Sequence, residues 1–108
     1  VYGNDGKLYL TGHVSSCIDF DGHAFSQTGL SDYFVARVDT SGMLDWVRPG
    51  GGTDRNYGYS VALDMQGNIF TTGTFGNDAT FGSTTLTGTN RFFLNKYDNA
   101  GMLLFSRL

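Results

Sequence analysis

The amino-acid sequence contains the same pattern twice, and this internal repeat constrains the fold more than any other feature. Four identical pairs lie 61 positions apart: Gly6/Gly67, Thr11/Thr72, Gly12/Gly73 and Phe20/Phe81. Six more lie 59 positions apart: Phe34/Phe93, Asp39/Asp98, Gly42/Gly101, Met43/Met102, Leu44/Leu103 and Arg48/Arg107. A length difference between Phe20 and Asp32, where a loop tolerates it, explains the change of offset. We therefore predict two copies of one unit, at residues 1–49 and 50–108.

Each unit is predicted to consist of short strands joined by turns. In the second unit, residues 59–63, 68–75, 92–97 and 102–108 have the β-branched and aromatic content of strands. Residues 64–67 and 98–101 have the pattern Asp-x-x-Gly, which residues 39–42 repeat in the first unit. This pattern predicts tight turns in which Asp caps the turn and Gly takes a positive φ. Strands joined in this way form a meander, and meanders side by side are typical of a β-propeller.

Composition favours an all-β domain and argues against two classes of partner. The 108 residues include nine Phe, six Tyr, sixteen Gly and a single Pro, as in chains of short strands and turns. The net charge is −3 and the seven basic residues are scattered, so we expect no nucleic-acid partner. No apolar run approaches the roughly 18 residues that cross a bilayer, so we expect no membrane insertion. Cys17 is the sole cysteine and is expected to be a small, partly buried side chain without a disulfide.

Four segments carry a resemblance to a known family: GNIFTTGTF, ATFGSTTL, FFLNKYDNAGMLLF and GGTDRNYGYSVALD. Together they resemble the SBBP-type β-propeller repeat over practically the whole chain. Arg91 and Phe105 depart from the acidic residue and the tryptophan that the first unit keeps as Asp32 and Trp46. The resemblance implies an all-β propeller fold with about two four-stranded antiparallel blades. It also implies a bacterial protein that is secreted or lies at the cell surface.

The first predicted blade is incomplete. Residues 1–3 correspond to residues 62–64, so the first blade lacks most of its innermost strand, and the chain is expected to be a processed protein or a piece of a longer one. Two blades cannot close a ring, and each would leave an apolar face in water. We therefore expect further propeller repeats or identical chains as partners that cover these faces.

The longer connections between strands are expected to carry any binding site. Residues 15–31, 48–56 and 76–90 are predicted to lie at one end of the blades, opposite the short turns, and binding residues concentrate on such loops. The main candidates for ligand binding are Asp32, Asp54, Arg55 and Tyr57. The ring of Tyr57 suits stacking on a sugar, although packing against a neighbouring blade explains it equally well.

Other polar residues match no catalytic or metal motif. Asp19 and Asp21 have the spacing that begins a calcium loop, but the later ligands are missing, so a solvated turn is expected. His13 and His23 lack a Cys or His at metal-binding spacing. No G-x-S-x-G sequence is present. We therefore expect no catalytic residue, no metal and no cofactor.

Three functions remain open on the sequence alone. The first is a non-catalytic β-propeller module that acts as an extracellular scaffold or binds protein or a surface polymer. The alternative is a lectin-like module with one weak sugar site per blade, strengthened by multivalency. The weakest is a fragment of a propeller enzyme whose catalytic residues lie elsewhere. Because a fold does not determine a function, the site itself has to decide.

Overall fold

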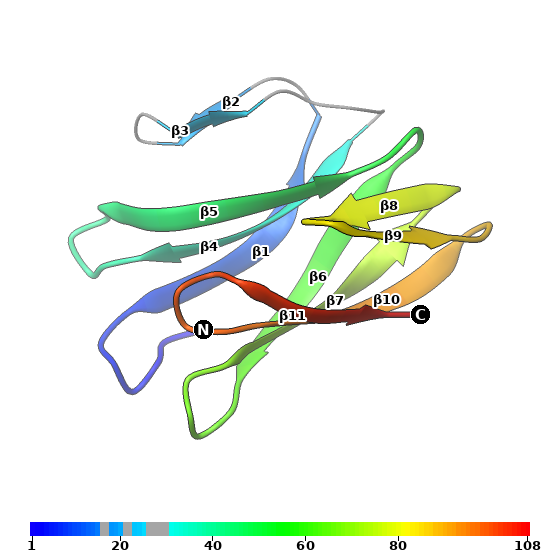
Figure 1. The fold of residues 1–108 in the computed structure, drawn as a ribbon. Coiled ribbons are helices and arrows are strands. Elements are labelled where there is room, and N and C mark those ends of the chain that lie inside the picture. The colour runs from blue at the N-terminus through cyan, green and yellow to red at the C-terminus, as the bar shows by residue number, and fades with distance from the viewer. Residues whose placement is uncertain (16–17, 21–22, 26–30) are drawn as a thin grey trace.

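A computed structural model describes the backbone of residues 1–15, 18–20, 23–25 and 31–108, and the side chains of residues 1–15 and 31–108. Every regular element within these residues is a strand, and no helix occurs among them (Figure 1). The strands are β1 (Leu8–Val14), β2 (Ile18–Phe20), β3 (His23–Phe25), β4 (Asp32–Val38), β5 (Leu44–Gly51), β6 (Asn56–Leu63), β7 (Ile69–Phe75), β8 (Asp78–Phe81), β9 (Thr84–Thr87), β10 (Arg91–Tyr97) and β11 (Leu103–Arg107). The all-β prediction is confirmed.

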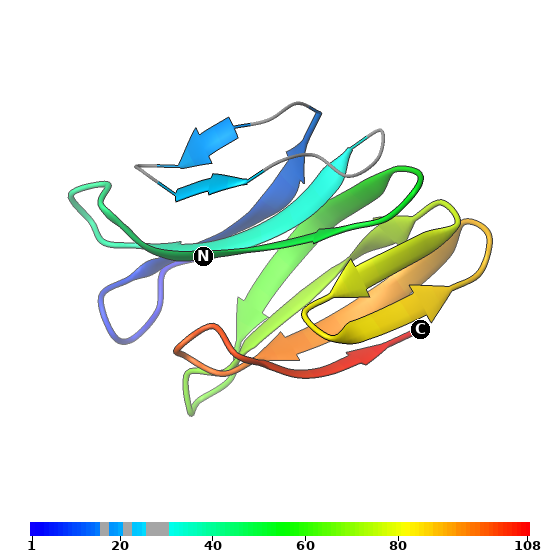
Figure 2. The same ribbon diagram turned by 45° about the horizontal axis from the view of Figure 1, so that its top comes forward.

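The strands form two main antiparallel sheets and a separate hairpin. The first sheet has the order β1-β4-β5-β8-β9, the second has the order β6-β7-β10-β11, and β2 pairs with β3. Neither main sheet closes on itself. In Figure 2 the first sheet lies between the β2–β3 hairpin and the second sheet. The second sheet is the four-stranded meander that the sequence predicts for residues 50–108.

Strand registers in the two halves of the chain match at the offsets found in the sequence. Neighbouring strands align Leu10, Ala36 and Val47 in the first sheet, and Thr71, Asn95 and Ser106 at the equivalent positions of the second. Both sheets also have a register shift at equivalent places, after Arg37 and after Lys96. Residues that are 61 or 59 positions apart therefore occupy the same places in their sheets.

Residues 76–90 differ from the prediction of a long connection, because they contain the β8–β9 hairpin. Strand β8 leaves its own half and pairs with the end of β5, where Gly50 lies opposite Phe81. A Cβ atom on Gly50 would lie 2.4 Å from the Phe81 ring, and one on Gly52 would lie 2.2 Å from the Asp78 carbonyl oxygen. The hairpin can approach β5 this closely only because glycines stand there. Since β5 continues to Gly51, the predicted connection over residues 48–56 is also shorter than expected.

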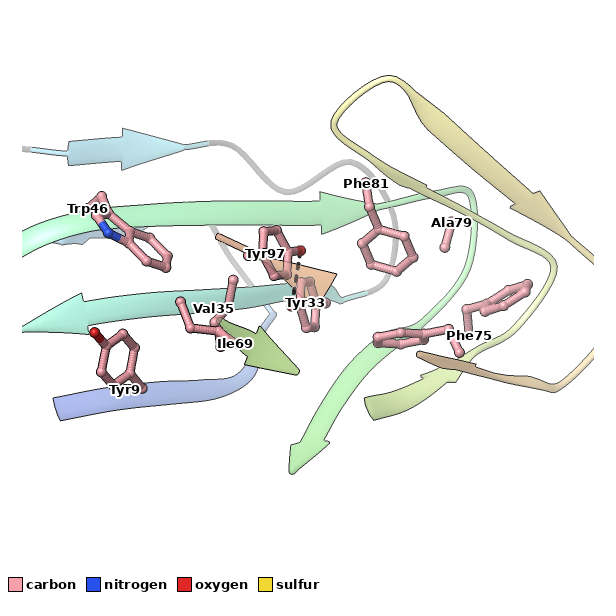
Figure 3. Packing of buried hydrophobic residues seen from close by; sticks show 10 residues of the cluster. Tyr9, Tyr33, Val35, Trp46, Ile69, Phe75, Ala79, Phe81 and Tyr97 are labelled. Atoms are coloured by element: carbon pink, nitrogen blue, oxygen red, sulfur yellow. Dashed lines mark hydrogen bonds between the residues drawn. The ribbon is translucent and has the colours of Figure 1, made fainter. Parts of the chain in front are cut away.

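The core fills the space between the two main sheets (Figure 3). It consists of ten buried side chains from both sheets: Tyr9, Tyr33, Val35, Trp46, Ile69, Phe75, Ala79, Phe81, Phe93 and Tyr97. Tyr33 is central, since its ring meets Phe81 edge to face at 5.2 Å and Phe93 at 5.4 Å between centroids. Residues from both halves of the chain therefore share one core.

A polar network runs through this apolar core. The Tyr33 hydroxyl lies 2.7 Å from the Thr71 hydroxyl and donates a hydrogen bond of 3.1 Å to the Tyr97 hydroxyl. Asn95 and Ser106 extend the network, since Asn95 Nδ2 donates to the Tyr97 hydroxyl and Ser106 donates to Asn95 Oδ1. Burial raises the pKa of Tyr97 to about 12 and that of Tyr33 well above its ordinary value, so both hydroxyls keep their protons at neutral pH.

The Asp-x-x-Gly turns have the predicted structure. In each turn the glycine amide donates to the aspartate carbonyl, at 3.0 Å in residues 39–42, 3.2 Å in residues 64–67 and 3.0 Å in residues 98–101. The glycines have φ values of +89°, +84° and +87°. Each aspartate Oδ1 also accepts hydrogen bonds from later backbone amides. Hydrogen bonds from the Ser41 hydroxyl and the Met43 amide lower the pKa of Asp39, and those from Asn68 lower the pKa of Asp64.

The first sheet holds the 98–101 turn of the second half. Arg48 Nε donates to the Gly101 carbonyl at 2.9 Å, and its Nη2 donates to the Ala100 carbonyl at 3.2 Å. Trp46 Nε1 donates to the Asn99 carbonyl at 3.2 Å, and the Arg48 guanidinium lies 5.3 Å from the Trp46 ring. These bonds satisfy carbonyl groups of the turn from across the sheet–sheet contact.

We predict that Tyr33→Phe lowers the free energy of unfolding by about 1–3 kcal/mol, because the buried Thr71 and Tyr97 hydroxyls lose a partner without gaining water. Tyr59→Phe is the control, since that side chain is 63% exposed and should leave stability unchanged. Urea denaturation followed by tryptophan fluorescence measures both variants. Equal stability of the two variants would contradict the network.

Substitutions of two glycines at equivalent turn positions distinguish the cost of backbone strain from the cost of a contact with the first sheet. Gly42→Ala should cost about 1–2 kcal/mol of unfolding free energy, because it forces a positive φ on alanine while its Cβ meets nothing within 4 Å. Gly101→Ala has the same backbone strain, and its Cβ would also lie 2.9 Å from the Trp46 ring and 3.0 Å from Arg48. We expect a further loss of about 1–3 kcal/mol from this overpacking. Equal losses in thermal or urea melts would show that the 98–101 turn is not held by the first sheet.

Candidate functional site

The strongest candidate site lies at the loop end of the second sheet. A pocket of about 450 Å³ opens there between the start of β6, the end of β7 and the start of β10. Three of the four predicted ligand-binding residues line it: Asp54, Arg55 and Tyr57. The rest of its wall consists of Thr74, Phe75, Gly76, Asn90 and Phe92.

Backbone contacts place Asp54 and Arg55 at the pocket. The Arg55 amide donates to Asp54 Oδ1 at 2.8 Å, and the Gly76 amide donates to the Arg55 carbonyl at 2.9 Å. A Cβ atom on Gly76 would lie only 2.4 Å from the Asp54 carboxylate, so a glycine is needed where β7 ends. The loop before β6 is thus fixed against the end of β7. It brings a carboxylate and a guanidinium to the pocket from two consecutive residues, Asp54 and Arg55.

Tyr57 belongs to a group of three rings along the edge strand β6. Its ring meets the imidazole of His13 in β1 edge to face, with centroids 4.4 Å apart, and stacks on Tyr59 at 6.0 Å and 23°. Gly58 allows β6 to lie this close to β1, since a Cβ there would be 2.3 Å from the Thr11 hydroxyl. No sequence pattern links His13 with Tyr57, because the two residues belong to different sheets.

Asp32, the fourth predicted residue, lies elsewhere. It begins β4, is 2% exposed, and lines a separate cavity of about 800 Å³ with Arg48, Gly50 and Gly51. A buried residue in a strand register opposite Val14 is poorly placed to meet the same ligand as Asp54. The sequence analysis groups Asp32 with the other three residues because it follows a long connection. Its position in the sequence does not determine where its side chain points.

Several other sequence candidates lie outside the described part of the chain. Cys17 and Asp21 fall on residues that the structure does not describe, and for Asp19 and His23 only the backbone in β2 and β3 is described. Among the described residues, no three His, Cys, Asp or Glu side chains gather where they could hold a metal ion. No described segment is a helix long and apolar enough to span a membrane.

Asn99 is the centre of a polar cluster at the opposite, turn end, which the sequence did not single out. Its side-chain Nδ2 donates to the Tyr9 hydroxyl at 2.7 Å and to the Gly67 carbonyl at 3.2 Å, while Arg37 donates to its carbonyl oxygens. The Tyr9 hydroxyl donates to the Asp5 carboxylate. Burial and this carboxylate raise the pKa of Tyr9. These bonds join three turns of the two sheets, so the cluster has a structural role.

The pocket offers binding chemistry. An aromatic ledge next to a carboxylate and a guanidinium suits ligands that have an apolar ring face and hydroxyl or amide groups at the edge. Within the part of the chain that the structure describes, His13 contacts a ring and no side-chain hydrogen bond links it to a serine or an aspartate. The arrangement of His13 and its neighbours therefore lacks the nucleophile–base geometry of a catalytic triad.

No protein-family model matches this chain, and no curated protein matches it. The function therefore has to be argued from the geometry of the sheets and of the loop-end pocket.

Proposed function

We propose that this chain is a non-catalytic β-propeller repeat module that acts as an extracellular scaffold or as a binding unit for protein or a surface polymer. Its blades are completed by further repeats or by identical chains. The resemblance to SBBP-type repeats supports this proposal and favours a bacterial cell-surface or secreted location.

One observation carries the proposal: the two main sheets pack face to face with equivalent residues in equivalent registers. A propeller is built from such units, each contacting only its neighbours. The second sheet has the strand order of a complete blade, and β1-β4-β5 supplies three strands of another. The isolated bridge between Tyr2 and Leu8 lies where the missing innermost strand of the first blade would pair. An open stack of two blades leaves one face of each without a neighbour.

We predict that the purified protein forms a discrete assembly with a mass that is a multiple of 11.7 kDa. Multi-angle light scattering measures the mass, and negative-stain electron microscopy of the same sample should show rings with a central opening. If identical chains do not assemble, the protein should stay monomeric at concentrations up to about 1 mM, at which even an interaction of about 4 kcal/mol would populate a complex. That result would contradict assembly through identical chains.

A lectin-like module is the second candidate, and the rings of Tyr57 and Tyr59 next to Asp54 and Arg55 favour it. Stacking of a sugar ring on tyrosine, with hydroxyl groups bound by a carboxylate and a guanidinium, uses the aromatic and both charged side chains of this pocket. A shallow site of this kind binds weakly alone, and several copies on one assembly would raise the avidity.

We predict that any glycan bound by the protein on a glycan array loses affinity at least about tenfold with Tyr57→Ala, which corresponds to about 1.4 kcal/mol. Tyr2→Ala is the control, since Tyr2 is a 63% exposed tyrosine that lines a different pocket near residues 61–67, whereas Tyr57 is half-buried. Circular dichroism confirms that both variants are folded. Absence of binding to all glycans, or equal loss with both variants, would argue against the lectin function.

A further inference from the structure

The second sheet has an apolar face that points away from the first sheet. Along β7 and β10, the residues at odd positions from Ile69 to Tyr97 fill the core, so the alternate residues point to the opposite side. The apolar and basic residues of this outer face are Phe70, Phe92, Leu94, Lys96, Phe105 and Arg107, and Thr72 and Thr74 lie among them. Phe92 is 74% exposed. In the registers, Lys96 lies opposite Phe70 and Phe105, and Leu94 lies opposite Arg107.

Each residue of this outer face has an equivalent that the first sheet uses to contact the second. The pairs are Phe70/Tyr9, Phe92/Tyr33, Leu94/Val35, Lys96/Arg37, Phe105/Trp46 and Arg107/Arg48. The aromatic and aliphatic members of the first-sheet set lie in the core, and its two arginines bind the 98–101 turn. The outer face of the second sheet therefore carries the same kinds of side chain as the face of the first sheet that packs on the second.

Arg107 also has the same side-chain arrangement as Arg48. Arg48 Nη1 donates to the carbonyl of the preceding residue at 3.1 Å and its guanidinium lies 5.3 Å from the Trp46 ring. Arg107 Nη1 donates to the Ser106 carbonyl at 3.1 Å and lies 5.1 Å from the Phe105 ring. The guanidinium of Arg107 is thus held in the arrangement from which Arg48 donates to the carbonyl groups of a turn.

The β2–β3 hairpin lies on the outer side of the first sheet (Figure 2), and Ala36 is fully buried there, so the part that is open to another chain lies around Leu10, which is 42% exposed. The outer face of the first sheet is altered in a way that matches Phe92. Inside the protein, the Tyr33 hydroxyl requires polar partners, and Thr71, Asn95, Tyr97 and Ser106 supply the network. Phe92 has no hydroxyl, and the positions equivalent to these four partners are all apolar: Leu10, Ala36, Val38 and Val47. The Phe34 ring lies over Gly12 as the Phe93 ring lies over Gly73. The hydroxyl of Tyr33 and its four polar partners thus have an apolar ring and four apolar residues as their equivalents. Two faces that pack on each other need such a match, because a buried polar group without a partner is costly.

We propose that the outer face of the second sheet docks on the outer face of the first sheet of a second copy of this chain, in the geometry that joins the two sheets within one copy. This inference rests on the proposed propeller module and identifies its partner surface. Phe92 of one copy packs on Leu10 of the other. Arg107 donates to the carbonyls of Ser41 and Gly42, which are equivalent to Ala100 and Gly101.

Such a contact is heterologous, because the two surfaces that meet are different. After the first contact each copy keeps one free surface, and the pair keeps one of each kind, so copies add head to tail until the ring closes. An isologous dimer, in which the same face meets itself, would bring Arg107 and Lys96 of both copies together and would leave Leu10 in water.

Two single substitutions test the docking, each on one face. Phe92→Asp places a charge on the outer face of the second sheet, and Leu10→Glu does so on the outer face of the first, where Leu10 is 42% exposed. Met65→Glu is the matched control, since Met65 is 98% exposed in the 64–67 turn and lies on neither face. Thermal melts establish that all three variants keep the fold. Sedimentation velocity then measures the mass of each variant and of the two face variants mixed in equal amounts.

We expect each face variant alone to associate at least about tenfold more weakly than the wild type, and Met65→Glu to associate as the wild type does. The mixture should form a one-to-one dimer of twice 11.7 kDa and nothing larger, because only one pair of intact faces remains. If the wild type assembles and the face variants assemble equally well, or if their mixture gives no dimer, the docking surface is wrong while the propeller module stands. A wild type that remains monomeric would overturn the docking of identical copies, and further repeats would then be the only partners left for the propeller module.

Discussion

A sheet with apolar side chains on both faces must be covered on both, and this constraint governs the whole protein. The first sheet satisfies it on one side by packing Tyr33 and its neighbours against Phe93 and Phe81. Apolar burial stabilises this contact, and the hydroxyl network around Tyr33 fixes its register. The same requirement applies to the outer faces, where Phe92 and Leu10 lie at positions equivalent to residues in the core. Packing between the sheets therefore determines the stability of the chain and, in the proposed propeller module, which faces a neighbour covers.

The two ends of the sheets have different tasks. At the turn end, the Asp-x-x-Gly turns are satisfied by their own aspartates and are joined across the sheets by Asn99, Arg37 and Arg48. At the loop end, the Asp54 carboxylate accepts hydrogen bonds from the Arg55 amide and from Asn77, the Tyr59 ring is 63% exposed and Tyr57 is half-buried. A rigid turn end and a more open loop end suit the proposed binding module, since backbone hydrogen bonds of Asn56 and Gly76 hold the loop in place.

Local patterns predicted much of this structure. The turns followed from Asp and Gly at fixed spacing, and the long strands followed from β-branched and aromatic runs such as residues 92–97. Three of the four site residues came together because residues 54–57 are close in sequence. The β8–β9 hairpin was missed, since residues 84–87 are short and polar and the pairing of β8 with β5 depends on contacts between distant segments. The run from Gly50 to Gly52 was the available signal, because consecutive glycines indicate a close backbone approach. Asn99 and His13 were missed for the same reason: their partners lie in the other sheet.

The most direct test of this account is a nuclear Overhauser experiment on the protein with labelled aromatic side chains. The account predicts strong cross-peaks from the Tyr33 ring to the rings of both Phe81 and Phe93, and from the Trp46 indole to the Gly101 α-protons. All of these contacts join the two halves of the chain, and those to Phe93 and Gly101 exist only if the two main sheets pack face to face. A folded protein that shows cross-peaks within each sheet, including those between Tyr33 and Phe81, but none between Tyr33 and Phe93 would contradict the account.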